Sequence, residues 1–441
     1  MSSESSFAKL VQVLQRYANV PPAEARALVE AFDEARSEDG RTIYVDPVNG
    51  NDSQDGSAAA PIKTLLEATR RVPLSAAAGM SVELLAGTHT LADVSALSDR
   101  TIFRAMSGVT IRGASSVAQV LTVASKAANV LTVDETLVAD ALIGKFIMPT
   151  PTTYRWIIDN DETTITLAAT TTELGGAVVL PATGALNVYQ LDTTIKSAAT
   201  NPGLVANRFY FDGAPIFEKL IFDANGGFAG PSSWSPSTFA TFTACKWTGA
   251  WSQATNCAGD STLAACMFDR GGVVAGYAHG VGINGKSLVT QDCVFKDYQT
   301  GVMASPGSVL TIGATYAAWA LALDRYVESD GAIVQDFSTR WWIDGGLSAF
   351  VIADGRGAQY MKANVAIVGA TGHKSATRAF ESREGSATFH LFDATALDLT
   401  LATALALMEG VEVPLADYLA GNAPASAARR FSDDLGNRIY F

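Results

Sequence analysis

Short runs of alternating apolar and polar residues, separated by Gly, Asn, Asp and Pro, recur along most of this chain. Alternation over about four to eight residues between turn residues is typical of β-strands with one buried face. The first runs are Thr42–Val45 and Val82–Leu85, and a turn-rich loop, Asn49–Gly56, and a helix-forming segment, Thr64–Ala68, lie between them. The pattern therefore predicts a mainly β fold.

Four strand cores in the second half of the chain repeat around one aromatic residue each. Phe222, Trp247, Phe268 and Phe295 follow one another at intervals of 25, 21 and 27 residues. A period of this size with Gly-rich corners predicts a β-solenoid, in which stacked coils share one continuous core. The last three aromatics each follow a cysteine by two positions, so we expect these cysteines to form a ladder of small buried side chains rather than a metal or redox site. They are Cys245, Cys266 and Cys293.

The order of elements from Thr42 to His89 is specific. A Tyr-Val strand is followed by a Gly-Asn-Asp loop, by Pro61–Thr64 with the form Pro-x-Lys-Thr, and by a Val-x-Leu strand that ends before Gly87 and Thr88. This order resembles the N-terminal motif of right-handed parallel β-helix proteins of the pectate-lyase-like superfamily. The resemblance implies that a right-handed parallel β-helix starts here.

Apolar residues at helical spacing precede the first strand. Pro21 and Pro22 divide them into two short amphipathic segments. The apolar stripe of such a helix has to face another surface, and two surfaces fit: the open end of the solenoid, which the helices would cap, or another protein of an assembly, on which they would dock. The candidate attachment residues are Phe7, Leu10, Leu14, Leu28 and Phe32.

Changes in the strand pattern divide the chain into five parts. Many short strands with frequent turns predict a small antiparallel β subdomain inserted into the solenoid. Near the end, 398–410 and 414–419 have helical patterns. The expected organisation is an N-terminal helical attachment segment (1–40), the β-helix start and first coils (41–119), the inserted subdomain (120–195), the main β-helix (196–370) and a distinct C-terminal closing or trimerisation region (371–441).

Composition limits the partners of the chain. Its 441 residues include 31 Lys and Arg against 44 Asp and Glu, a formal net charge of −13, which argues against binding nucleic acid or an anionic membrane through bulk charge. The sequence shows no signal peptide and no run of about 18 apolar residues that could span a bilayer, so we expect synthesis in the cytoplasm and no membrane insertion. The four Cys follow no CxxC pattern and the four His have no metal spacing, so we expect no metal and no other cofactor.

Two motif matches have simpler structural explanations. Gly280–Ser287 fits the phosphate-binding pattern GxxxxGK[ST], but that loop needs a helix to begin at its Lys, whereas Leu288–Phe295 continues as strand. Asn51–Gly56 partly fits a calcium loop, but Ile62 stands at the twelfth position, where a Glu is needed. We therefore predict a Gly-rich solenoid corner and a turn held by its own Asx hydrogen bonds.

Two groups of side chains are candidates for contact with carbohydrate. Acidic residues beside the strand cores either bring two carboxylates about 5 to 10 Å apart on neighbouring coils, as glycosidases need, or are solvated charges that keep strands from aggregating. Aromatic rings in polar surroundings either stack on sugar faces or are buried against another subunit. The acidic candidates are Asp223, Asp269, Asp292 and Asp297. The aromatic candidates are Trp234, Trp251, Tyr277, Trp341 and Trp342.

The combination of helical start, β-helix motif, inserted β subdomain and distinct C-terminal region resembles phage tailspike and head-spike proteins, including the spike fibres of gene transfer agents. The resemblance implies a homotrimer on the exterior of a virion or phage-like particle. It would be joined to other virion proteins by its N-terminal helices and would attach to a bacterial capsular or O-antigen polysaccharide. Two alternatives stay open: a polysaccharide depolymerase, hydrolase or lyase, on the same fold, and a structural connector between spike and capsid or tail. No catalytic motif matches residue by residue, which favours a non-enzymatic adhesin.

Overall fold

The structure, a computed structural model, describes residue 21 and, with gaps, 41–440. The candidate attachment residues, Phe7, Leu10, Leu14, Leu28 and Phe32, lie outside the described residues. The described ranges after residue 21 are 41–72, 79–91, 108–127, 129–168, 183–197, 210–211, 215–223, 235–236, 240–249, 253–257, 260–272, 279–312, 317–321, 323, 325–336, 340–354, 359–362, 367–382, 388–391, 405–408, 411–414, 430–432 and 438–440.

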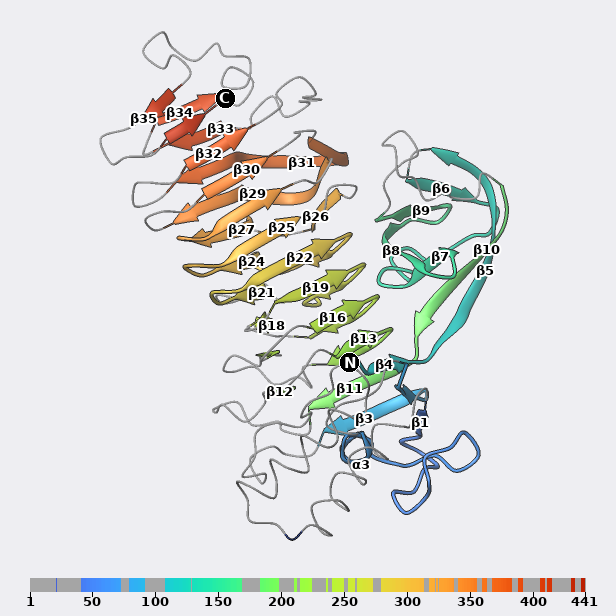
Figure 1. Ribbon diagram of the computed structural model, residues 1–441. Coiled ribbons are helices and arrows are strands. Elements are labelled where there is room, and N and C mark those ends of the chain that lie inside the picture. Colours follow the sequence, from blue (N-terminus) through green and yellow to red (C-terminus); the bar gives the residue numbers. More distant parts are fainter. Residues whose placement is uncertain are drawn as a thin grey trace, which may run out of the picture.

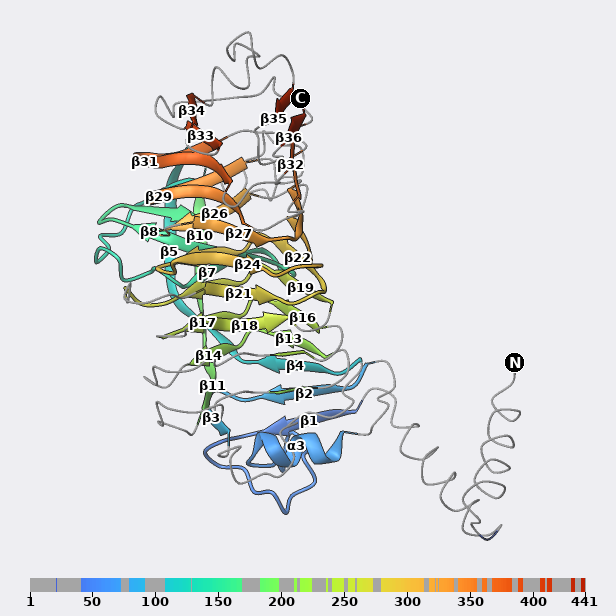
Figure 2. The same ribbon diagram turned by 90° about the vertical axis from the view of Figure 1, so that its left-hand side faces the viewer.

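Parallel strands from successive coils stack into two long sheets around a common core (Figures 1 and 2). The first sheet has 13 strands, in spatial order β1 (Thr42–Val45), β2 (Ser81–Leu84), β4 (Thr110–Gly113), β13 (Ile216–Glu218), β16 (Ala240–Thr243), β19 (Ser261–Ala264), β22 (Ser287–Gln291), β25 (Val309–Ile312), β28 (Ile333–Asp336), β30 (Gln359–Lys362), β32 (Thr388–Leu391), β36 (Arg438–Tyr440) and β35 (Arg430–Ser432). The predicted mainly β, parallel β-helix fold is confirmed.

The second sheet has 15 strands and lies across the core from the first. One part runs β3 (Gly87–Leu91), β11 (Thr193–Ser197), β14 (Ile221–Asp223), β17 (Lys246–Thr248), β20 (Met267–Asp269), β23 (Val294–Lys296), β26 (Ala317–Leu321) and β29 (Arg340–Asp354). The other runs from β29 through β27 (Arg325–Asp330), β24 (Thr300–Ala304) and β21 (His279–Ile283) to β18 (Gln253–Cys257), and β31 (Ile367–Ser382), β33 (Leu405–Met408) and β34 (Val411–Pro414) extend it.

One residue in the left-handed conformation turns the chain from the first sheet to the second in each of four successive coils. Lys219, Ala244, Ala265 and Asp292 occupy this corner, with φ between 48° and 56°. The corner amide continues the hydrogen bonding between coils, as where Ala265 N–H donates to the Gln291 carbonyl at 2.8 Å. A left-handed φ costs a residue with a Cβ about 1–2 kcal/mol, and the bonds between coils offset this cost.

The aromatic residues of the repeat stack inside the second sheet in the register expected from the sequence. The pairs Phe222–Trp247, Trp247–Phe268 and Phe268–Phe295 lie side by side in neighbouring strands. All four side chains are fully buried, and the ring of Phe268 stacks 4.5 Å from Trp247 and 4.8 Å from Phe295. The three cysteines of the repeat are buried and free, as predicted.

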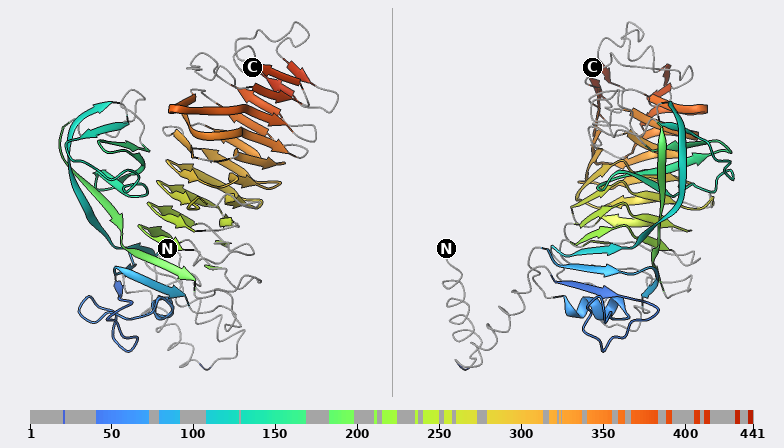
Figure 3. Two further views of the ribbon diagram at one scale, coloured as in Figure 1. Left: turned by 180° about the vertical axis from the view of Figure 1, so that it is seen from behind. Right: turned by 90° about the vertical axis from the view of Figure 1, so that its right-hand side faces the viewer.

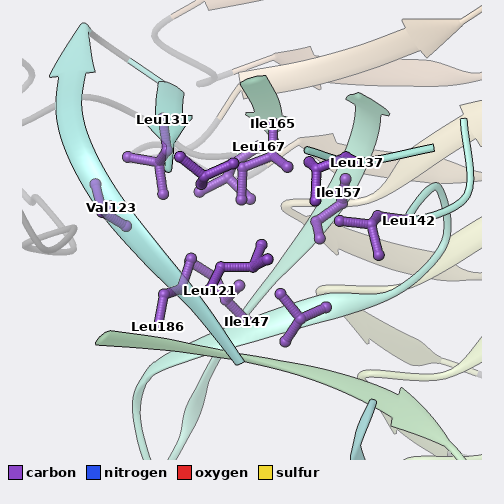
Figure 4. Packing of buried hydrophobic residues seen from close by; sticks show 12 residues of the cluster. Leu121, Val123, Leu131, Leu137, Leu142, Ile147, Ile157, Ile165, Leu167 and Leu186 are labelled. Atoms are coloured by element: carbon purple, nitrogen blue, oxygen red, sulfur yellow. The ribbon is translucent and has the colours of Figure 1, made fainter. Parts of the chain in front are cut away.

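Between β4 and β11 the chain leaves the solenoid and forms a closed antiparallel barrel. The strands span 115–191, compared with the expected 120–195, because only Ala114 separates β4 from the barrel. Figure 3 shows the barrel beside the stack of coils, joined to it by the long paired strands β5 and β10. Leucine, valine and isoleucine side chains fill its interior (Figure 4). The strands are β5 (Ser115–Ala127), β6 (Val130–Val133), β7 (Phe146–Thr150), β8 (Thr153–Asn160), β9 (Thr164–Leu167) and β10 (Gly184–Leu191).

The loop that partly fits a calcium site closes on itself at the start of the solenoid. Asp52 Oδ1 accepts the N–H groups of Lys63 at 2.9 Å and Thr64 at 2.8 Å, just before helix α3 (Leu65–Arg71). Asp55 Oδ1 accepts the N–H of Ser57 at 2.8 Å. The predicted turn with Asx hydrogen bonds is confirmed, and the described part of the chain holds no group of His, Cys, Asp or Glu residues suited to a metal ion.

The match to the phosphate-binding pattern lies across two strands. β21 ends at Ile283, and β22 begins at Ser287, directly after the Lys of the pattern. A strand has no N-terminal turn of free amides to receive a phosphate. The predicted solenoid corner is therefore confirmed.

The C-terminal strands continue the two sheets. In the first sheet β32 pairs with β30 and β36, and in the second β33 pairs with β31. The helix expected over 398–410 is wrong at 405–408, where β33 is a strand antiparallel to β34; the rest of that range lies outside the described residues. Pairing with an available sheet edge overrides the local helical pattern here. Residues 415–419 of the second expected helix lie outside the described ranges.

We expect Phe268→Ala to lower the free energy of unfolding by about 3–5 kcal/mol, because it leaves a cavity between two stacked rings in the core. Val48, which is 69% exposed, provides the control substitution Val48→Ala, for which we expect almost no change. Chemical denaturation of both variants measures the two losses. A loss below about 1 kcal/mol for Phe268→Ala would contradict the aromatic stack.

Candidate functional site

A row of polar side chains runs along the outside of the second sheet, beside the aromatic stack. Because the aromatic in the middle of β14, β17, β20 and β23 points inward, the residues on either side of it point outward. The residue after each aromatic is polar, partly exposed and in register with its neighbours. Together with the matching lysine of β11, these residues form the polar ladder: Lys196, Asp223, Thr248, Asp269 and Lys296.

Two ion pairs join lysines to the aspartates of the polar ladder. Lys196 Nζ lies 3.6 Å from Asp223 Oδ2. Lys246, which points outward one position before its aromatic, has its Nζ 3.9 Å from Asp269 Oδ2. Ion pairs this long and partly solvated contribute at most about 1 kcal/mol to stability, so a ligand can replace them at small cost.

Lys246 lies where the second sheet meets the barrel. A Cβ on Gly144 of the barrel would lie 2.3 Å from Lys246 Nζ, and Gly144 has a φ of +77°, so a larger residue there would displace the ammonium group. Burial lowers the pKa of Lys246; Asp269 raises this pKa and the Lys296 cation lowers it further. The two lysine ammonium groups are therefore close enough to repel each other.

The turn after β20 brings two of the candidate carboxylates together. Asp269 Oδ1 accepts the N–H of Gly271 at 2.9 Å, and Asp297 Oδ2 accepts the N–H of Gly272 at 2.7 Å. Because adjacent amides hold them, the two bound carboxylate oxygens are at most about 9 Å apart. The two carboxylates are therefore no farther apart than the separation of about 5 to 10 Å that glycosidases use.

Two buried polar side chains lie beside this turn. Arg270 and Tyr298 are each 1% exposed. Burial raises the pKa of the Tyr298 hydroxyl, the Arg270 cation lowers it, and the carboxylates of Asp269 and Asp297 raise it. The four side chains therefore form one electrostatically connected group at the end of the polar ladder.

Strand β8 of the barrel packs along the corners of successive coils. Trp156 Nε1 donates to the Ala265 carbonyl at 2.7 Å, and the Tyr154 hydroxyl donates to Glu218 Oε1 at 3.3 Å. Apolar side chains of the barrel also pack against Met267 on the outside of the second sheet. The barrel is thus fixed beside the polar ladder along several coils.

A buried ion pair joins the barrel to one corner. Arg155 Nη1 lies 2.8 Å from Asp292 Oδ2, and the two side chains are 5% and 4% exposed. Burial raises the pKa of Asp292 to about 7 although Arg155 acts to lower it. Asp292 precedes β23, whereas Asp297 follows it, so this carboxylate lies apart from the other acidic candidates and contacts the barrel.

The structure places the remaining candidates as follows. Asp223 lies in the polar ladder, paired with Lys196. Trp341 and Trp342 lie in β29, opposite residues of β26, and their side chains are not described. Trp234, Trp251 and Tyr277 lie outside the described residues.

The lysines of this surface were not among the candidates predicted from the sequence. Lys196, Lys246 and Lys296 follow one another at intervals of 50 residues, which is a signal visible in the sequence. Their common surface follows only from the register of the stacked strands.

Comparisons with known proteins add the following. No protein-family model and no curated protein sequence matches this chain. It is similar to the structure of XylC in complex with xylose (9% identity, TM-score 0.34, 91% of this chain and 82% of the other). It is also similar to a glycoside hydrolase (10% identity, TM-score 0.35, 79% of this chain and 92% of the other). A third similar structure is the tailspike protein gp49 of Pseudomonas phage LKA1 (9% identity, TM-score 0.22, 76% of this chain and 70% of the other). At such identities and TM-scores the likenesses carry no argument about activity. In the described ranges no helix is long and apolar enough to cross a membrane.

We expect Arg155→Met to lower the free energy of unfolding by about 3–5 kcal/mol at pH 8, because Asp292 is left buried without its cation. Burial holds the pKa of Asp292 in the folded chain above its pKa in the unfolded chain. At a pH between these two pKa values, the folded state keeps a proton that the unfolded chain releases. Stability of the variant should therefore fall as pH rises from about 4.5 to 8. Thermal unfolding at several pH values measures this slope.

The double variant Arg155→Met with Asp292→Asn removes the stranded charge. It should recover most of the lost stability and lose the added pH dependence. If the single variant Arg155→Met had the stability of the wild type at pH 8, this result would contradict the buried ion pair.

Proposed function

We propose that the protein is a spike or fibre protein of a phage or phage-like particle, which attaches to a capsular or O-antigen polysaccharide of a bacterial surface through the polar ladder. The observation that carries this proposal is the register of the polar ladder: five partly exposed polar residues follow one another on five neighbouring strands. A linear polymer is the ligand that matches a linear row of this kind.

Spacing and chemistry both favour a sugar chain. Neighbouring strands lie about 4.8 Å apart, which is close to the length of one sugar ring in an extended chain. Lysine donates hydrogen bonds, aspartate accepts them and threonine does both, so the polar ladder offers both roles to sugar hydroxyls. Hydrogen bonds to charged groups are the stronger ones, and they give affinity along an extended surface.

The proposal includes the assembly. The 1–40 segment would join the chain to other virion proteins, three copies would form the spike, and the particle exterior would be its location. Trp234, Trp251, Tyr277, Trp341 and Trp342 are proposed as additional stacking rings for sugars.

We expect the double variant Asp223→Ala with Thr248→Ala to weaken binding of a recognised polysaccharide at least about tenfold, because charged and neutral hydrogen bonds to the sugar are lost. Asp134→Ala on the barrel, an exposed position, is the matched control and should bind like the wild type. Isothermal titration with a panel of purified capsular and O-antigen polysaccharides measures both. Equal affinity of the two variants would contradict the polar ladder as the binding surface.

A second candidate function is cleavage of the bound glycan, favoured by the carboxylates of Asp269 and Asp297 on adjacent amides. One carboxyl group would protonate the glycosidic oxygen, and the other would take a proton from the water that attacks the anomeric carbon as the C–O bond breaks.

Incubation with a polysaccharide that the protein binds should then release reducing ends. Asp297→Asn should abolish the release, and Asp134→Asn should not. Binding without any shortening of the polymer would contradict cleavage and leave the adhesin.

A further inference from the structure

Cationic side chains recur at every second coil on this face of the second sheet. Lys196 and Lys296 belong to the polar ladder, whereas Lys246 lies in the outward row beside it, with its Nζ 3.9 Å from Asp269 of the ladder. Lys196 lies in β11, Lys246 in β17 and Lys296 in β23, and one strand separates each from the next. With neighbouring strands about 4.8 Å apart, successive lysines are roughly 10 Å apart along the stack. This distance is close to the length of two sugar rings in an extended chain.

Acidic side chains occupy the coils in between. Asp223 lies in β14 and Asp269 in β20. Asp269 also accepts the Gly271 N–H, so its charge is shared between a backbone donor and the distant Lys246 ammonium. Positive and negative positions thus alternate with a period of two coils.

Lys246 and Lys296 lie at the end of the row that packs against the barrel, where Asp269 and Asp297 carry the opposing charges. No ion pair joins Lys296 to any carboxylate in the described part of the chain. Lys246 is 18% exposed and its partner Asp269 is 13% exposed, so water screens this region less than the open surface. The chain as a whole carries −13, so lysines at regular intervals on one face differ from its overall charge.

We propose that the polar ladder binds an anionic linear polysaccharide with one acid group on every second sugar, whose acid groups lie at Lys196, Lys246 and Lys296. This inference rests on the proposed function and names the class of glycan. A carboxylate of the glycan beside each lysine is held by the point charge of the ammonium group.

The aspartates between the lysines determine which polysaccharides bind tightly. A polysaccharide with an acid group on every sugar would place a carboxylate beside Asp223 and another beside Asp269, and like charges at such sites weaken binding. A neutral polysaccharide would leave Lys296 without an anion. The surface therefore prefers alternating charge over both uniform charge and none.

Three probes with known spacing of acid groups test this proposal: hyaluronan, with a carboxylate on every second sugar, polygalacturonate, with one on every sugar, and neutral dextran. Bacterial polysaccharides of known repeat extend the series. We expect the tightest binding to polymers of the alternating class and at least about tenfold weaker binding of them by Lys296→Gln. Lys286→Gln, which removes the same charge from an exposed turn, is the control and should bind like the wild type.

A gain of function gives a second readout. Asp223→Asn with Asp269→Asn should raise affinity for polygalacturonate relative to hyaluronan, because the repelling charges are gone. The inference is overturned if the tightest binder is neutral or uniformly acidic, or if Lys296→Gln binds like Lys286→Gln. If the protein binds a neutral polysaccharide tightly, and the double variant Asp223→Ala with Thr248→Ala binds it more weakly, only the proposed charge pattern is overturned. If the protein binds no polysaccharide, the proposed function is overturned as well.

Discussion

The corner between the two sheets is the constraint on which the rest of the structure depends. One left-handed residue per coil, such as Ala265 or Asp292, turns the backbone from the first sheet to the second in a fixed geometry. Because the corner recurs at the same point of four coils, the strands that follow it start in register. The register stacks the aromatic rings inward and, by the alternation of strand side chains, places the polar ladder outward. Core and binding surface are thus two sides of the same strands.

The inserted barrel uses the same corners. Trp156 donates to the carbonyl of one corner residue, Ala265, and Arg155 pairs with another, Asp292. Its apolar side chains cover the outward row before the aromatics, which includes Met267 and Val294. The row after the aromatics stays partly exposed beside it. The barrel therefore fixes one border of the proposed binding surface and lowers the exposure of Lys246.

The inward half of the second sheet could be predicted from the sequence, whereas its outward half could not. Aromatic residues repeat visibly because each must fill the core, so the spacing of Phe222, Trp247 and Phe268 gave the true register. A polar residue is tolerated at many exposed positions, so Lys196 and Lys296 do not stand out until the strands are stacked. The acidic candidates show the same limit, because Asp292 and Asp297 are five residues apart in sequence but lie on either side of β23 and have different partners.

A crystal structure of the protein with an oligosaccharide of several repeats, taken from a polymer that it binds, would show whether a linear glycan lies along the polar ladder. We expect continuous sugar density running across the strands from Lys196 to Lys296, with the acid groups near the lysines. Sugar density on the outer face of the first sheet, with the polar ladder empty, would contradict it.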